Sequence, residues 1–121
     1  MTPEKEMLEL AAKAMGYTLK WGEEYMIGDG KVDCTDMSYV VSNQPDEADW
    51  YWSPLEDDGD ALRLAVKLGI GLDFLETANN VLQVWANHHI EDHIENAGTD
   101  PYAATRRVIV RAAAEIGRSM K

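Results

Sequence analysis

Residues 100–120, DPYAATRRVIVRAAAEIGRSM, carry the most regular pattern in this sequence. Asp100, or Thr99 before it, suits the N-cap of a helix, and Pro101 suits the first helical position because its missing N–H would have no partner there. One apolar face follows at helical spacing, made of Tyr102, Thr105, Ile109, Ala112, Ala113, Ile116 and Met120. The stretch therefore predicts a long amphipathic helix with arginines on its other faces.

Two other stretches have the same kind of pattern. Residues 2–15 begin with Thr2 as a candidate N-cap and Pro3 at the first helical position, and Gly16 follows as a stop signal. Residues 57–68 begin with three carboxylates that suit the positive end of a helix dipole, and Gly69 ends them. Their predicted buried stripe is Ala61, Leu64, Ala65 and Leu68. The sequence thus predicts three helices.

The segments between the predicted helices are rich in β-formers. Runs 17–21, 38–42, 72–76 and 81–86 are typical of strands, and 77–80 fits a hairpin connection. The stretch 22–37 predicts a long loop or an irregular hairpin, and 88–98 fits a strand or a helical turn, with a strand favoured. We therefore expect one α+β domain over residues 1–121. In it, three helices pack on a small, mostly antiparallel sheet of three to four strands, in the order α-β-β-α-β-β-α.

The charge balance narrows the classes of partner. The chain has 22 acidic and 11 basic residues and a net charge of −11, so duplex DNA or RNA is not expected as a partner. No apolar run reaches the ~20 residues that cross a bilayer, and the acidic start MTPEKEMLEL argues against a secretory signal. The single cysteine, Cys34, fits a reducing compartment, which predicts a cytoplasmic protein without a membrane partner.

Three segments resemble a known family. They are WSPLEDDGDALRLAVKLGI at 52–70, DPYAATRRVIVRAAAEIGRSM at 100–120 and MLELAAKAMGY at 7–17, and together they cover about half of the chain. All three resemble the phage α/β/α-sandwich domain family, which comprises uncharacterised accessory proteins of phages and prophages. The resemblance implies helices on both sides of a sheet and a phage origin, hence the cytoplasm of an infected bacterium. It implies no catalytic residues.

Two groups of side chains are candidate binding residues. Trp50, Tyr51 and Trp52 could stack on a base or fill a protein hot spot, and Trp50 is favoured because Asp49 beside it indicates a solvent edge. Trp52 and Trp85 are expected instead to cap the core. The second group could hold a phosphate-bearing ligand if the two helices that carry it lie side by side, although pairing with nearby carboxylates is the favoured interpretation. Its members are Arg63, Lys67, Arg106, Arg107 and Arg111.

The histidine-rich segment is the weakest candidate site. It contains His88, His89, Asp92 and His93. On a helix His89 and His93 would share a face at the spacing used in zinc sites, and on a strand they would share one with Glu91 and Glu95. Cysteine ligands and the helical glutamate of metalloproteases are both missing from the segment, so we expect surface histidines and no metal or cofactor.

These observations favour a protein that binds rather than catalyses. The leading hypothesis is a non-enzymatic, phage-encoded inhibitor of a host process, with antiviral defence favoured. It would sequester a small nucleotide-type immune signal, or it would block a host protein with its acidic surface. A homo-oligomer would serve the first mode by building a pocket between subunits. The alternatives are a small metal-dependent hydrolase that uses the histidine cluster and a phage accessory protein with a purely structural role.

Overall fold

The computed structural model describes residues 3–22, 24–33, 37–41, 50–87 and 92–120. In chain order its elements are α1 (Pro3–Met15), β1 (Thr18–Trp21), β2 (Glu24–Ile27), β3 (Gly30–Asp33), β4 (Ser38–Val41), β5 (Trp50–Tyr51), α2 (Asp58–Leu68), β6 (Gly71–Glu76), β7 (Leu82–Asn87), β8 (Asp92–Asn96) and α3 (Pro101–Ser119). The predicted α+β class is confirmed. Thr2, Cys34, His88 and His89, which figured in the sequence predictions, lie outside the described residues.

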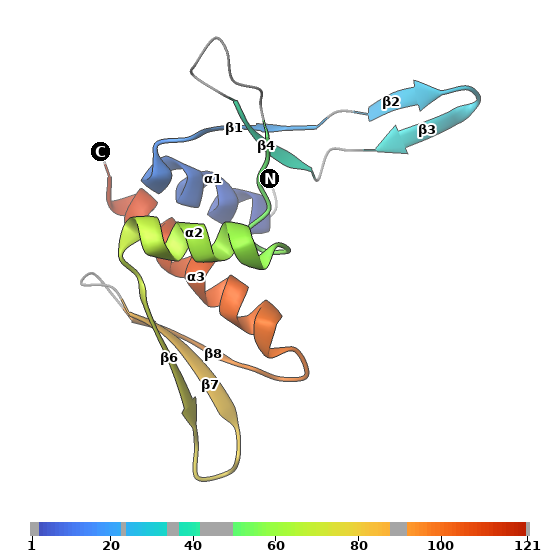
Figure 1. The fold of residues 1–121 in the computed structure, drawn as a ribbon. Coiled ribbons are helices and arrows are strands. Elements are labelled where there is room, and N and C mark those ends of the chain that lie inside the picture. Colours follow the sequence, from blue (N-terminus) through green and yellow to red (C-terminus); the bar gives the residue numbers. More distant parts are fainter. Residues whose placement is uncertain (1–2, 23, 34–36, 42–49, 88–91, 121) are drawn as a thin grey trace.

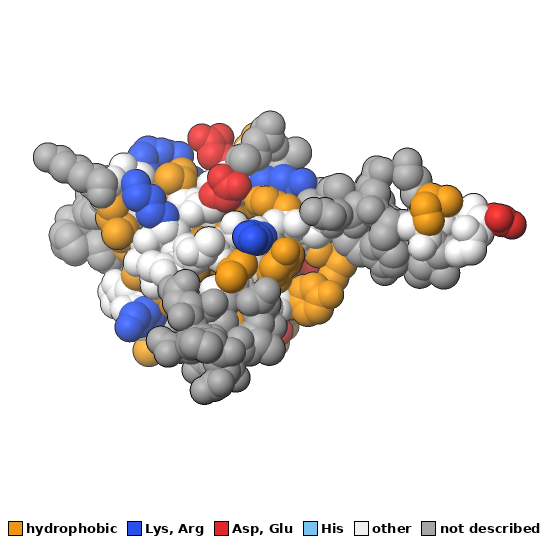
Figure 2. Space-filling view, turned by 90° about the horizontal axis from the view of Figure 1, so that it is seen from above, with side chains coloured by type: hydrophobic (Ala, Val, Ile, Leu, Met, Phe, Trp, Pro, Cys, Tyr) orange, Lys and Arg blue, Asp and Glu red, His pale blue; other side chains and the backbone are white. Residues whose placement is uncertain are grey.

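The three helices lie between two antiparallel sheets (Figure 1). One sheet has the strand order β1-β4-β5 and the other the order β6-β7-β8, while β2 pairs with β3. This hairpin projects from the body as an arm (Figure 2). The strands are therefore divided between two sheets and a hairpin, whereas we predicted one sheet of three to four strands. The reason is local pairing, because α2 separates the strands that precede it from a meander of three consecutive strands that follow it. The layering also differs from the one that the family resemblance implied, because the sheets lie on both sides of the helices and not the helices on both sides of one sheet (Figure 1).

The capping signals of α2 and the N-cap of α3 form as predicted. Asp57 is the N-cap of α2 and accepts a hydrogen bond of 2.9 Å from the backbone N–H of Asp60. Gly69 ends this helix in the left-handed region, at a φ of 69°. At the start of α3, Asp100 accepts hydrogen bonds from the backbone of Tyr102 and Ala103. These contacts join residues close in sequence, which explains why the helix boundaries could be predicted.

Helix α3 is the centre of the core. It packs against α1, α2, β7 and β8, so more of its circumference is covered than a single stripe predicts. Its buried residues are Ala104, Val108, Ile109, Val110, Ala112, Ala113, Ala114 and Gly117. The predicted stripe was wrong at both ends, because Tyr102 is 70% exposed and Met120 follows the helix and is exposed.

Candidate partner-binding groove

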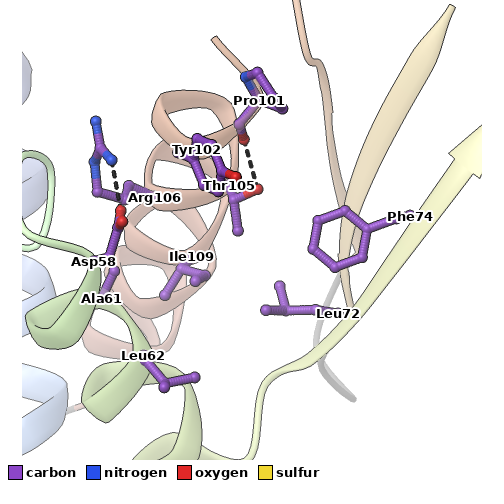
Figure 3. A pocket seen from close by; sticks show the side chains of 10 residues that line it. All are labelled: Asp58, Ala61, Leu62, Leu72, Phe74, Pro101, Tyr102, Thr105, Arg106 and Ile109. Atoms are coloured by element: carbon purple, nitrogen blue, oxygen red, sulfur yellow. Dashed lines mark hydrogen bonds and ion pairs between the residues drawn. The ribbon is translucent and has the colours of Figure 1, made fainter.

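A groove opens between α2, α3 and β6 (Figure 3). Its volume is about 430 Å³. Leu62 reaches it from α2, Leu72 and Phe74 from β6, and Tyr102 and Ile109 from α3. Its other lining residues are Asp58, Ala61, Pro101, Thr105 and Arg106. The lining is mostly apolar, as is usual for sites that bind ligands or protein segments.

The position of α3 explains why this groove is open. Because α3 packs on β7 and β8, it covers the inner face of their sheet at Val84 and Ala86, which are fully buried. Strand β6 lies beyond the part of the sheet that α3 covers. Phe74, on the same face of the sheet as Val84, therefore stays 56% exposed. Leu62 on α2 is 58% exposed across the groove. Large apolar side chains gathered around a hollow mark an interaction site more often than scattered ones do.

Three polar side chains of the groove, those of Asp58, Thr105 and Arg106, are bonded to the protein itself. Arg106 donates through Nη1 to Asp58 Oδ1 at 2.6 Å and through Nε to the carbonyl oxygen of Leu55 at 2.9 Å. The Thr105 hydroxyl donates to the carbonyl oxygen of Pro101 at 2.7 Å. The groove therefore offers apolar contact and one fixed ion pair at its rim, an arrangement suited to binding (Figure 3).

The four arginines of the predicted cation group are distributed among three ion-paired sites. Besides the Arg106 pair, Arg63 contacts Asp60 and Asp57 at 2.9 and 3.9 Å. The hydrogen bond with Asp60 holds the pKa of Arg63 above its ordinary value. Only Arg106 of the group lines the groove. Lys67 is exposed near the end of α2.

The other two arginines join α3 to the neighbouring sheet. Both oxygens of the Glu95 carboxylate on β8 accept charge-assisted bonds, from Arg107 Nε at 2.9 Å and from Arg111 Nη1 at 2.7 Å. This pairing was the favoured interpretation of these cations. A phosphate-bearing ligand would have to compete with this carboxylate, which already bonds to both arginines although it balances only one of their two charges.

The predicted aromatic group divides between the core and the surface. Trp52 is buried at 3% exposure, and its ring lies edge-to-face against Tyr17 with centroids 5.8 Å apart. Trp50 packs on Tyr17 in the same way at 5.6 Å and is 40% exposed, while Tyr51 points to solvent. The expectation for Trp52 is confirmed. That for Trp85 was wrong, because the strand register places it on the face of its sheet opposite to buried Val84.

The described part of the histidine segment is a strand. Strand β8 begins at Asp92, as favoured from the sequence, so Asp92 and His93 point to opposite faces of the sheet and cannot share one metal ion. His93 lines a small cavity with Arg111, Arg118 and Glu115, and the two arginines outnumber the one carboxylate, which disfavours a cation. In the described ranges, no three side chains of the metal-ligating types form a group that could hold a metal ion.

Two exposed apolar residues that line the groove, Leu62 and Phe74, were not predicted as site residues from the sequence. Leu62 was outside the predicted buried stripe of its helix, and Phe74 was noted only as a strand former. A leucine on the solvent side of an amphipathic helix was the available signal. Phe74 carried no such signal, because its exposure depends on which strands of the sheet α3 covers.

Comparison with protein-family models, curated proteins and solved structures found no match to this chain. The resemblance to the phage family therefore stays a prediction. Within the described residues, no helix is both long enough and apolar enough to span a bilayer.

Proposed function

We propose that this chain is a non-enzymatic binding protein whose groove holds an apolar segment of a protein partner. The observation that carries the proposal is the exposure of Leu62, Phe74 and Tyr102 around one hollow on an otherwise strongly charged chain. Burying a leucine or phenylalanine side chain completely is worth about 1.5–3 kcal/mol. A partner that covers the exposed parts of these residues would gain a useful share of that free energy.

The geometry supports a protein partner over a nucleotide. Arg63, Arg106, Arg107 and Arg111 each have a carboxylate partner, and the net charge of −11 opposes the approach of a phosphate. An apolar groove on a chain with a net charge of −11 suits an apolar segment that carries lysines or arginines. We further predict that the partner is a host protein and that the chain is a phage-encoded inhibitor of host defence. This prediction rests on the family resemblance alone.

A selection from a displayed library of short random peptides tests the proposal. Neighbouring residues of β6 provide the matched pair of variants, because Phe74 faces the groove and Leu75, 50% exposed, faces the other side of the sheet. We expect peptides selected on the wild-type protein to lose about tenfold or more of their affinity for Phe74→Glu, since removing an anchor residue typically costs over 1 kcal/mol. Affinity for Leu75→Glu should stay within about twofold.

Both variants add the same negative charge to the same strand, so a difference between them reports the groove and not electrostatics. Circular dichroism and urea unfolding check that each variant is folded. Failure to enrich any peptide, or equal binding to both variants, would reject the groove as the binding site.

A further inference from the structure

Strand β6 has an edge that no described strand covers. In its sheet the order is β6-β7-β8, so β6 pairs with β7 on one side and, within the described ranges, with nothing on the other. Alternate residues of such an edge direct their N–H and C=O groups outward, ready to pair with another strand. Natural edge strands are often shielded, whereas this one borders an open groove.

The groove lies over this edge. Leu72 and Phe74 share the face of β6 that lines it, and Leu62 faces them from α2 (Figure 3). A strand added beside β6 would lie about 4.8 Å from it in the plane of the sheet. Every second side chain of that strand would then point to the side of the sheet on which Leu62 and Tyr102 lie. Backbone pairing and apolar contact are thus available to one occupant at the same time.

The charges around the edge select the chemistry of that occupant. Asp73 and Glu76 belong to β6, and Asp58 lines the groove. Asp58 is paired with Arg106, whereas Asp73 accepts a hydrogen bond only from the neutral amide of Asn87 and keeps its charge. Asp73, Glu76 and the net charge of −11 therefore make the local field negative. A second copy of this chain would bring the same negative charges to the edge, which disfavours it. Lysines or arginines on the incoming strand would be attracted.

We infer that the occupant of the groove is an extended segment of alternating apolar and basic residues that adds a strand to the edge of β6. The inference rests on the proposed function and specifies its partner class and its mode of binding, which is strand addition to an open sheet edge. Backbone hydrogen bonds would supply part of the affinity. The apolar side chains of the segment would pack beside Leu62 and Phe74, and this packing would decide which face of the added strand points toward the groove.

Hydrogen exchange of the isotope-labelled protein tests this mode of binding. The probe is a capped peptide of alternating lysine and valine. We expect its binding to slow exchange about tenfold or more at the alternate, outward-facing amides of β6. In one control peptide, prolines that lack the N–H replace valines, so charge is kept and pairing is lost. In a second control, glutamate replaces lysine. Both should bind at least tenfold more weakly.

The outcomes separate this inference from the proposed function. If library peptides bind the groove and lose affinity for Phe74→Glu, but the β6 amides stay unprotected, the groove binds another conformation, such as a helix, and strand addition is rejected. If the β6 amides are already protected in a dimer of the free chain, a second copy is the occupant and the inference is also overturned. Equal affinity for the proline and valine peptides rejects backbone pairing, whatever the groove binds.

Discussion

At the scale of single residues, Gly117 decides how closely α1 and α3 approach. A Cβ built on this glycine would overlap the carbonyl group of Leu10 in α1. Glycine inside a helix costs about 0.5–1 kcal/mol relative to alanine, so its presence here reflects the close contact of the two backbones. Buried residues close to Gly117 on α3, such as Ala113 and Ala114, are small as well.

We therefore predict that Gly117→Ala destabilises the protein by about 3 kcal/mol, because the overlap is with backbone and the two helices must separate. Urea unfolding followed by circular dichroism measures the change. Gly59→Ala is the control, since its added methyl group would meet no backbone atom and only side-chain ends, those of Arg63 at 3.3 Å and Asp57 at 3.4 Å. An unchanged midpoint for Gly117→Ala would show that the helices do not cross here.

At the scale of secondary-structure elements, α2 joins the two parts of the fold and depends on its first turn. Asp57 caps it, and the buried carboxylate of Asp60 accepts hydrogen bonds from the Ser53 backbone and from Arg63. These bonds attach the helix to the segment that follows β5 and place Leu62 at the groove.

Loss of the cap should have a measurable and reversible effect. We predict that Asp57→Ala lowers the free energy of unfolding by about 1 kcal/mol, because the Asp60 N–H loses its acceptor, and that Asp57→Ser restores most of it. Thermal and urea unfolding of the two variants provide the comparison. Equal stability of the alanine and serine variants would contradict the role of the cap.

The elements themselves were largely predictable, because their signals are local. Caps, glycine stops and β-rich runs lie within a few residues of the boundaries that they specify, as Asp57, Gly69 and Asp100 illustrate. Predictions that needed neighbours from elsewhere in the chain were less successful. Trp85 was assigned to the core although its strand register turns it outward, and Tyr102 was assigned to a buried stripe although it stays exposed.

At the scale of the whole molecule, repulsion between negative charges opposes folding. With a net charge of −11, carboxylates outnumber their cationic partners, and the folded state brings them closer together than the unfolded chain does. The arginines of α2 and α3 relieve part of this repulsion through Asp58, Asp60 and Glu95. The rest remains on the surface.

Screening should therefore stabilise the fold. Raising NaCl from about 0.01 M to about 1 M shortens the Debye length from roughly 30 to roughly 3 Å, and we predict that the melting temperature rises by a few degrees. The exposed ion pairs lose little, because each contributes at most about 1 kcal/mol. Differential scanning calorimetry measures the shift. A fall in melting temperature would mean that the ion pairs outweigh the repulsion.

The sequence by itself determined the α+β class, the three helices with most of their ends, and the acidic character that disfavours duplex nucleic acid, because these properties follow from neighbouring residues or from composition. Only the tertiary structure decided that the strands form two sheets, which carboxylate pairs with each arginine, and that β6 lies beyond the part of the sheet that α3 covers. These features depend on contacts between residues far apart in the chain. A single sequence carries no local pattern for such contacts, which is why Leu62 and Phe74 emerged as groove residues only once α2, α3 and β6 were placed together.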